Sequence, residues 1–195
     1  MVLAAGRGLR FGGATPKPLL ELGGRPLVTH AVRAALGSGL GTVLVVVSDD
    51  RVASVLPEGV RVVRNDAPER GIASSLQAAL RALEPDDAVD GVVVGLADQP
   101  LVGADAYARV ARAYDDGARL AVATYAGARA NPVLLGRTHW DEALGLTGDE
   151  GARVLLRRYG AEEIPCDGTG EPTDVDTPED LASLEKVWKS QTASE

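Results

Sequence analysis

A glycine-rich segment with basic side chains lies at the start of the chain and has the composition of an anion-binding loop. Its basic side chains are Arg7, Arg10, Lys17 and Arg25, against a single acidic residue, Glu21, whereas the whole chain has a formal net charge of −8. Glycines that follow a strand allow backbone N–H groups to close around a phosphate without clashes from a Cβ atom. This segment therefore predicts a pocket for one anionic ligand.

Neither of two common phosphate-binding loops matches this segment. A P-loop requires a glycine directly before its lysine, but Lys17 follows Pro16. A dinucleotide-binding fingerprint requires a third glycine where Phe11 stands, and a ribose-binding acid about 20 residues after the loop. The next expected strand ends much later, at Asp49 and Asp50. A flexible surface loop remains the alternative interpretation of these glycines and arginines.

Asp98 is a candidate ligand for a hard cation. It comes directly after the apolar run Gly91–Ala97, where a strand of an α/β sheet would end and where such sheets bind ligands. Mg²⁺ is held in proteins by one or two carboxylates together with phosphates and water. The alternative for Asp98 is a plain turn or cap in front of Pro100.

The elements that must position these residues alternate along the chain. The expected strands are Val2–Ala4, Thr42–Val47, Val60–Val63, Gly91–Ala97, Arg119–Thr124 and Val133–Leu135. The expected helices are Pro26–Leu36, Ile72–Leu83, Ala104–Asp115, Gly148–Tyr159 and a last one that follows Asp176 and runs towards Trp188. Continuous valine and leucine runs are typical of parallel strands that are buried on both faces. The sequence therefore predicts a single-domain α/β fold, with a mostly parallel, Rossmann-like sheet flanked by helices on both faces.

Length and composition narrow the class of protein. A chain of 195 residues favours one domain, which we assign to residues 1–190, with a frayed tail at 191–195. The net charge of −8 argues against binding to nucleic acid or to an anionic membrane surface. No apolar run approaches the ~20 residues that a membrane span needs, and no secretory leader is recognisable. We therefore expect a cytoplasmic protein.

Six motifs, in their order along the chain, give the sequence a resemblance to the MobA-like nucleotidyltransferases. They are Leu3-Ala4-Ala5-Gly6-x-Gly8-x-Arg10 with Lys17-Pro18, Gly71-x-x-Ser74-Ser75-Leu76, Asp98-Gln99-Pro100, Asn131-Pro132, Thr147-Gly148-Asp149-Glu150-Gly151-Ala152-Arg153 and Asp174-Val175-Asp176-Thr177-Pro178. Within this class the chain is most similar to the molybdenum cofactor cytidylyltransferases, because the Leu-Ala-Ala-Gly form of the first motif goes with that branch. The resemblance implies a fold like that of the nucleotide-diphospho-sugar transferases.

The resemblance also implies a reaction and the residues that serve it. CMP would pass from CTP to the phosphate of molybdopterin, pyrophosphate would leave, and Mg²⁺ would be required. Catalysis would depend on Arg10, Lys17 and Asp98. The nucleotide would contact Leu3, Ala4, Ala5, Gly6, Gly8, Arg10, Lys17, Ser74, Ser75 and Gln77. The acceptor would contact Asn131, Asp149 and Arg153, and a molybdoenzyme apoprotein is a further implied partner.

Several of these assignments have alternatives. Mg²⁺ would be held by Asp98 together with Asp174 or Asp176, but Asp176 followed by Thr177 is also typical of a helix N-cap. The sequence leaves open which of the two aspartates binds the metal. Ser74 and Ser75 could equally lie in a first helical turn, and Asp149 could cap the helix that follows it.

Three other functions compete with molybdopterin cytidylyl transfer. One is a binding module that holds the molybdenum cofactor, or delivers it to a molybdoenzyme, without nucleotide chemistry. Transfer of a nucleotide to another phosphorylated acceptor, such as a sugar phosphate, uses the same chemistry. An NAD(P)-dependent oxidoreductase of the nicotine blue reductase type belongs to a different class, and the missing third glycine argues against it. The expected first strand, Val2–Ala4, is short, whereas family members usually have several more residues before the loop, so we expect a shortened N-terminus.

Overall fold

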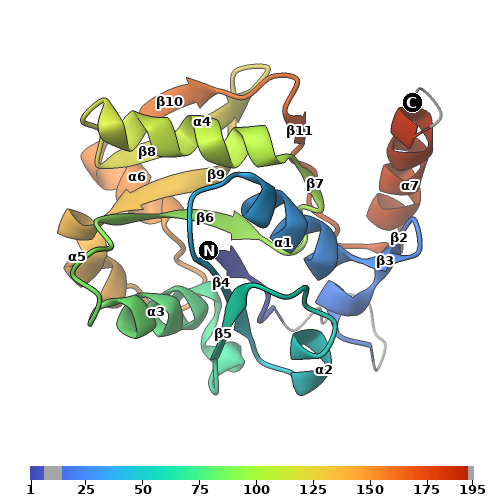
Figure 1. Ribbon diagram of the computed structural model, residues 1–195, viewed down its shortest axis with the longest axis horizontal. Helices are drawn as coiled ribbons and strands as arrows, with labels where there is room; N and C mark the ends of the chain where they lie inside the picture. Colours follow the sequence, from blue (N-terminus) through green and yellow to red (C-terminus); the bar gives the residue numbers. More distant parts are fainter. Residues whose placement is uncertain (7–14, 193–195) are drawn as a thin grey trace.

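A seven-stranded sheet runs through the centre of the protein in this computed structural model, which describes residues 1–6 and 15–192 (Figure 1). The strand order is β10-β8-β9-β6-β1-β4-β5. The bounds are β1 Val2–Leu3, β4 Val43–Val47, β5 Val60–Arg64, β6 Gly91–Leu96, β8 Leu120–Tyr125, β9 Ala128–Gly136 and β10 Glu162–Pro165. Only β9 pairs antiparallel with its neighbours in this sheet, so the prediction of a mostly parallel α/β sheet in one domain is confirmed.

Helices cover both faces of the sheet. Helices α1 (Leu27–Gly37) and α4 (Ala104–Asp115) share one core with the sheet, and α3 (Ile72–Leu83), α5 (Trp140–Leu144) and α6 (Arg153–Tyr159) share the other. Figure 1 shows α4 along one face and α3 along the opposite one. The remaining elements are α2 Asp50–Ala53, α7 Pro178–Thr192, η2 Lys17–Leu19, η3 Pro68–Arg70, η4 Arg137–His139 and the strands β2 Glu21–Leu22, β3 Arg25–Pro26, β7 Leu101–Val102 and β11 Gly170–Glu171.

The apolar strand β4 shows why the sheet is buried on both sides. All five of its residues are buried, and successive side chains point to opposite faces of a strand. Val43, Val45 and Val47 belong to the core with α1 and α4, whereas Leu44 and Val46 belong to the core with α3. A continuous apolar run therefore supplies both cores, as the sequence predicts. None of the helices in the described residues is long and apolar enough to cross a membrane.

Several predicted bounds are wrong for identifiable reasons. The helix expected at Gly148–Tyr159 begins only at Arg153, because Gly148 has a φ of +58° and its carbonyl accepts a hydrogen bond from Ala73 N at 3.1 Å. Strand β9 is longer than the predicted Val133–Leu135 because an irregularity in its pairing with β8 accommodates Pro132. Strand β10 is an acidic edge strand, so its sequence lacks the apolar signal. Of the predicted tail, residues 191–192 continue α7, and residues 193–195 lie outside the described residues.

Helix α7 is held against the hairpin formed by β2 and β3, as Figure 1 shows at the right. The indole ring of Trp188 packs edge-on against the His30 ring, with centroids 5.0 Å apart. Gly23, in the hairpin turn, has a φ of +56°, and a Cβ atom there would lie 2.2 Å from Trp188 Nε1. The close packing of α7 on the hairpin therefore depends on the absence of a side chain at Gly23.

Replacing Gly23 with alanine should weaken this packing more than the same change at the adjacent Gly24. Both glycines have positive φ, +56° and +73°, but a Cβ at Gly24 meets nothing within 4 Å. Gly24→Ala should lower the free energy of unfolding by about 1 kcal/mol through backbone strain alone. Gly23→Ala should cost about 1–3 kcal/mol more, because the indole must move. Urea denaturation measures both, and equal losses would contradict the account.

Candidate active site

Lys17 joins two carboxylates that come from distant parts of the chain. Its Nζ donates a hydrogen bond of 2.7 Å to Asp98 Oδ2 and one of 2.6 Å to Asp176 Oδ1. The lysine side chain is only 10% exposed. Lys17 is the first residue of the short helix η2 and lies between Pro16 and Pro18. Because proline restricts backbone rotation, the two prolines help to aim the lysine. The predicted residues Lys17, Asp98 and Asp176 therefore meet at one point.

The charge of this lysine is stabilised by its partners. Burial on its own would lower the pKa of Lys17, but the charges and hydrogen bonds of Asp98 and Asp176 outweigh burial and raise the pKa. The ammonium group is consequently a permanent positive charge at neutral pH. It offsets the repulsion between two carboxylates that converge on the same place.

Asp98 has one oxygen that the described part of the chain does not satisfy. It follows β6 and Ala97, and its Oδ2 accepts from Lys17, while its Oδ1 is buried without a hydrogen-bond partner among the described residues. A buried, unpaired carboxylate oxygen is unfavourable unless another group binds it. This oxygen fits the predicted role of Asp98 as a ligand for a cation.

The segment before α7 brings the second carboxylate to the site. Val175 N donates to the carbonyl of Asp98 at 2.9 Å, which ties the two segments together. Thr177 and Asp180 form a reciprocal capping box: Asp180 Oδ2 accepts from Thr177 N at 2.8 Å, and Thr177 Oγ1 accepts from Asp180 N at 3.2 Å. The capping role that the sequence left open for Asp176 is thus taken by Thr177 and Asp180, and Asp176 Oδ1 pairs with Lys17.

Asp174 lies close enough to the same charges to be affected by them. Loss of hydration raises its pKa, and the neighbouring charge of Asp98 raises it further, while Arg153 acts in the opposite direction. Within residues 1–6 and 15–192, no group of three or more His, Cys, Asp or Glu side chains is arranged to hold a metal by itself. A metal at Asp98 would therefore need ligands from a bound molecule as well.

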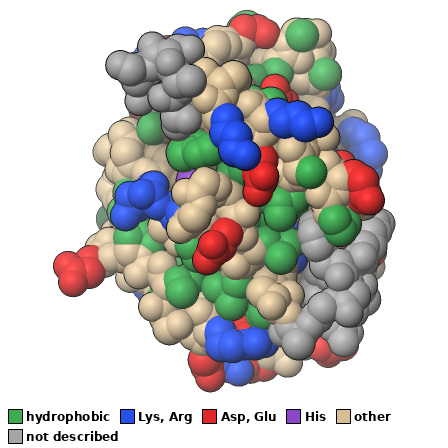
Figure 2. Space-filling view, turned by 90° about the vertical axis from the view of Figure 1, so that its right-hand side faces the viewer, with side chains coloured by type: hydrophobic (Ala, Val, Ile, Leu, Met, Phe, Trp, Pro, Cys, Tyr) green, Lys and Arg blue, Asp and Glu red, His purple; other side chains and the backbone are tan. Residues whose placement is uncertain are grey.

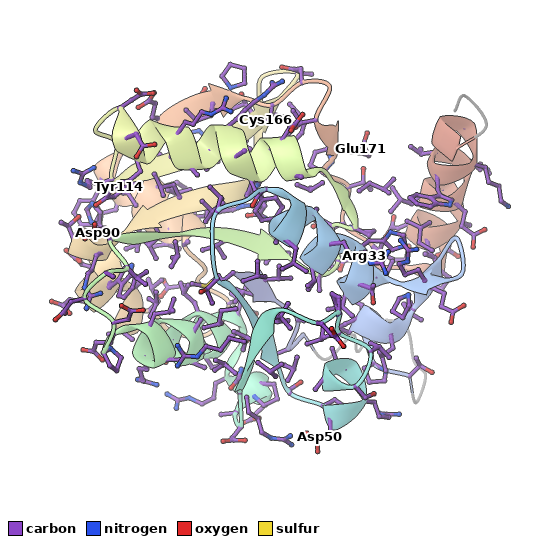
Figure 3. All side chains as sticks on the ribbon, in the orientation of Figure 1. Arg33, Asp50, Asp90, Tyr114, Cys166 and Glu171 are labelled. Atoms are coloured by element: carbon purple, nitrogen blue, oxygen red, sulfur yellow. The ribbon has the colours of Figure 1, made fainter. Side chains whose placement is uncertain are left out.

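A cavity of about 440 Å³ opens at these residues, beyond the carboxyl ends of β1 and β6. Figure 2 shows the side of the molecule towards which β6 points, where acidic, basic and apolar side chains are interspersed. In Figure 3, Asp90 is labelled just before the start of β6, and Glu171 and Arg33 are labelled on the side towards which the strand runs. The carboxyl end of β6 is therefore on that side, and ligands of α/β sheets bind at the carboxyl ends of the strands.

The cavity contains most of the predicted nucleotide-binding residues. Its lining includes Leu3, Ala4, Ala5, Gly6, Lys17 and Ser75. Gly8 and Arg10 lie outside the described residues, so the structure places neither of them. The described part of the lining carries one cationic side chain, Lys17, and four anionic ones, Glu69, Asp98, Asp149 and Asp176.

Ser74 and Gln77 have structural hydrogen bonds instead of facing this cavity. Ser74 Oγ donates to the carbonyl of Gly71 at 2.8 Å, so its interpretation as a first-turn serine is confirmed. Gln77 Nε2 donates to the carbonyls of Leu144 and Leu146 at 2.9 and 2.8 Å and holds that loop against α3. Both residues line a neighbouring cavity of about 340 Å³.

The three predicted acceptor-binding residues share a further cavity. Asn131, Asp149 and Arg153 line a space of about 250 Å³ that has Asp149 in common with the larger cavity. Helix α6 begins at Arg153 after Ala152, without a side-chain cap, so the interpretation of Asp149 as a helix cap is wrong. Sequence reasoning also missed Gln99, which accepts from Asn131 Nδ2 and donates to the carbonyl of Pro172, both at 2.9 Å. Gln99 lies within the motif Asp98-Gln99-Pro100, but its contacts are long-range, and the motif does not indicate them.

Replacing Lys17 with methionine should destabilise the protein. The change leaves Asp98 and Asp176 facing each other without a cation, and we expect a loss of about 1–2 kcal/mol in the free energy of unfolding, because both carboxylates retain some solvent. The contribution of a lysine with a raised pKa is complete below its ordinary value of 10.5 and is lost as the pH rises through the folded value.

Urea denaturation at neutral pH and well above pH 10.5 measures both parts of this expectation. The difference between the wild-type protein and Lys17→Met should shrink at alkaline pH. Lys189→Met is the control, because Lys189 is 77% exposed and pairs with Glu185 on the surface of α7 at 3.9 Å. A Lys17→Met protein as stable as this control would contradict the assigned role.

Comparison with protein families and curated proteins gives a consistent result. Residues 1–164 match the family described as the MobA-like NTP transferase domain. The chain is 33% identical to the purine catabolism protein PucB of Bacillus subtilis (strain 168), over 95% of this chain and 94% of PucB. It is 40% identical to the bifunctional protein GlmU of Kineococcus radiotolerans, over 76% of this chain and 30% of GlmU.

The chain is also 42% identical to 2-C-methyl-D-erythritol 4-phosphate cytidylyltransferase of Frankia casuarinae, over 60% of this chain and 44% of that cytidylyltransferase. The chain thus spans less than half the length of GlmU and of this cytidylyltransferase.

Solved structures show the same architecture. The crystal structure of Rv0371c from Mycobacterium tuberculosis H37Rv has a TM-score of 0.82 with this protein, at 28% identity and over 95% of both chains. A crystal structure of Rv0371c in complex with manganese has a TM-score of 0.77 at 28% identity, over 95% of this chain and 96% of Rv0371c.

Proposed function

The chain belongs to the MobA-like NTP transferase family, and from that premise we propose that it is a Mg²⁺-dependent cytidylyltransferase. The proposed reaction transfers CMP from CTP to the phosphate of a molybdopterin-type acceptor. Family membership supports a nucleoside triphosphate as substrate. The observation that supports the metal dependence and the site of the reaction is the convergence of Lys17, Asp98 and Asp176 at the cavity beyond the ends of β1 and β6.

The charge of the cavity favours a triphosphate that arrives with a metal ion. The described lining has one cation and four carboxylates, so a free triphosphate would be repelled. Additional positive charge is needed, and the basic residues Arg7 and Arg10 lie outside the described residues. A divalent cation bound to the phosphates supplies such charge at the site itself.

The residues at the site suit this metal. Asp98 offers Oδ1, which has no partner among the described residues, and Asp176 or Asp174 would supply a second carboxylate. When bound, Mg²⁺ would neutralise the phosphoryl oxygens and hold them in a fixed geometry. The related structure of Rv0371c in complex with manganese supports a divalent cation in a protein of this fold.

In the proposed reaction an oxygen of the acceptor phosphate attacks the α-phosphorus of CTP. The bond between the α-phosphorus and the bridging oxygen breaks, and pyrophosphate leaves with the negative charge. Transfers of this kind depend on positioning and on stabilisation of charge more than on covalent chemistry. The ammonium of Lys17 is buried, charged and adjacent to the cavity, so it can stabilise charge on the triphosphate.

Two observations support cytidine as the base. The first motif has the form Leu3-Ala4-Ala5-Gly6, which resembles the cytidylyl branch, and these residues line the cavity. One of the relatives is named a cytidylyltransferase. That relative acts, according to its name, on 2-C-methyl-D-erythritol 4-phosphate, so transfer to a phosphorylated polyol or sugar is the second candidate function. Membership of a transferase family does not support the oxidoreductase alternative.

Asp98→Asn should greatly slow the proposed reaction while preserving the fold. The amide keeps the size of the side chain but removes the charge that would bind the metal. We expect pyrophosphate release from CTP, with Mg²⁺ and molybdopterin, to fall by about 10²-fold or more, as when an electrostatic stabiliser is removed. Asp105→Asn is the matched control, because Asp105 is exposed on α4 and is not among the residues that line the cavity. Equal rates for the two variants would contradict the role of Asp98.

Nucleotide preference can be measured without knowing the acceptor. At equal concentration, a ligand that binds only the folded state raises the melting temperature more the more tightly it binds. In the presence of Mg²⁺, CTP should raise the melting temperature more than GTP, UTP or ATP, and chelation of the metal should remove most of the effect. A larger shift with GTP or ATP would overturn the assignment of cytidine, and a larger shift with NADPH would favour the oxidoreductase alternative.

A further inference from the structure

Asn65, which belongs to none of the six motifs, is a buried polar residue directly after β5. It is 4% exposed, and its backbone N–H donates to the carbonyl of Val47 at 2.8 Å, which ties it to the end of β4. Its side-chain Nδ2 donates to Ser74 Oγ at 2.9 Å and to Ser75 Oγ at 3.0 Å. Asn65 therefore links the carboxyl edge of the sheet to the first turn of α3.

The backbone determines which way the Asn65 amide faces. The side-chain oxygen Oδ1 accepts from the backbone N–H of Ala67 at 3.0 Å, and a backbone N–H can only donate. The NH2 group must therefore face the serines and offer one hydrogen to each hydroxyl oxygen. If the amide were turned over, its NH2 group would face the Ala67 N–H, and two donors would oppose each other.

The two serines differ in where their own hydroxyl proton goes. Ser74 Oγ accepts from Asn65 and donates to the carbonyl of Gly71 at 2.8 Å, so its proton is used within the protein. Ser75 Oγ also accepts from Asn65, but no acceptor for its proton lies among residues 1–6 and 15–192. Ser75 is 5% exposed and lines the cavity of about 440 Å³, which Ser74 does not. Because an unpaired buried donor is unfavourable, Ser75 is suited to donate to a ligand in that cavity.

The two pyrimidine bases respond differently to a group that can only donate. The ring nitrogen N3 accepts a hydrogen bond in cytosine and donates one in uracil. The C4 substituent donates in cytosine and accepts in uracil, and O2 accepts in both. A donor-only hydroxyl therefore favours cytosine at N3, favours uracil at the C4 substituent and does not discriminate at O2. A site that hydrogen-bonds one ligand strongly rejects an analogue that cannot make the bond.

We propose that Asn65 is a positioning residue that fixes the Ser75 hydroxyl as a hydrogen-bond donor to N3 of cytosine. The inference rests on the proposed function, because it supplies the means by which that site would select CTP over UTP. Asn65 does not line the cavity, so it acts on the base only through Ser75.

Replacing Asn65 with aspartate reverses the hydroxyl without changing the size of the side chain. The carboxylate can still accept from the Ala67 N–H, but its second oxygen also only accepts, so Ser75 would donate to it and turn a lone pair towards the base. Isothermal titration with CTP and with UTP, in the presence of Mg²⁺ and without an acceptor, gives the ratio of the two dissociation constants. The wild-type protein should bind CTP at least about 10-fold more tightly than UTP, and Asn65→Asp should lower that preference by about 10-fold or more.

The ratio separates this role from general damage to the site, because an added charge or a loosened helix weakens both nucleotides alike. Asn65→Ala leaves the Ser75 hydroxyl free to rotate, so its preference for CTP should lie between those of the wild-type protein and Asn65→Asp. A purely structural role would make alanine the more damaging change, since aspartate has the shape of asparagine.

Ser75→Ala should bind CTP and UTP about equally, because it lacks the donor. Ser54→Ala is the matched control: Ser54 is an exposed serine directly after α2, donates to the carbonyl of Arg51 at 2.8 Å and does not line the cavity. This control should keep the wild-type preference. Circular dichroism confirms that each variant is folded.

An unchanged preference for CTP in Asn65→Asp, or equal losses of CTP and UTP binding in Ser75→Ala, would overturn the assignment. The outcome is separable from that of the proposed function. If no pyrophosphate is released from CTP but Asn65→Asp lowers the preference for CTP binding, the role of Asn65 stands and the reaction is wrong. If CTP is turned over and Asn65→Asp keeps the full preference, the reaction stands and the role of Asn65 is wrong.

Discussion

The contact of one ammonium group with two carboxylates determines how the site is built. Lys17 lies 81 residues from Asp98 and 159 residues from Asp176, and the three meet within hydrogen-bond distance. Without the cation, the two carboxylates would repel each other, so the start of η2, the end of β6 and the segment before α7 are mutually dependent. The capping box of Thr177 and Asp180 fixes the start of α7, and the packing of Trp188 against Gly23 holds α7 on the hairpin, so both help to position the segment that carries Asp176.

The same contact explains how an acidic cavity could accept an anionic substrate. The ammonium uses one oxygen of Asp98 and leaves the buried Oδ1 without a described partner. A metal ion that arrives with the triphosphate can bind that oxygen, whereas a triphosphate without a metal meets mostly carboxylates. On the proposed function, the site would therefore discriminate in favour of the metal complex of the nucleotide. The neighbouring cavity of about 250 Å³ has the opposite balance of charge, because its charged lining residues are Arg153, Arg157 and Asp149.

The sequence predicts the parts of this arrangement that have local signals. Lys17 is isolated between prolines, Asp98 follows an apolar strand, and the valine runs indicate the sheet. Residues whose roles come from long-range contacts are not predictable in this way. Gln99, for example, links Asn131 to Pro172 through hydrogen bonds of its side chain. Capping by Thr177 and Asp180, in place of Asp176, depends on side-chain geometry that sequence spacing does not resolve. The resemblance implies that Gln77 contacts the nucleotide, and the structure adds a long-range role, because its Nε2 donates to the carbonyls of Leu144 and Leu146.

The position of the metal tests the central claim most directly. A crystal of the protein with CTP and Mn²⁺, measured at the manganese absorption edge, locates the ion by its anomalous scattering. The account predicts a peak within coordination distance of Asp98 Oδ1 and of the phosphates, in the cavity of about 440 Å³. An ordered nucleotide with manganese bound away from Asp98, or a nucleotide bound outside this cavity, would contradict it.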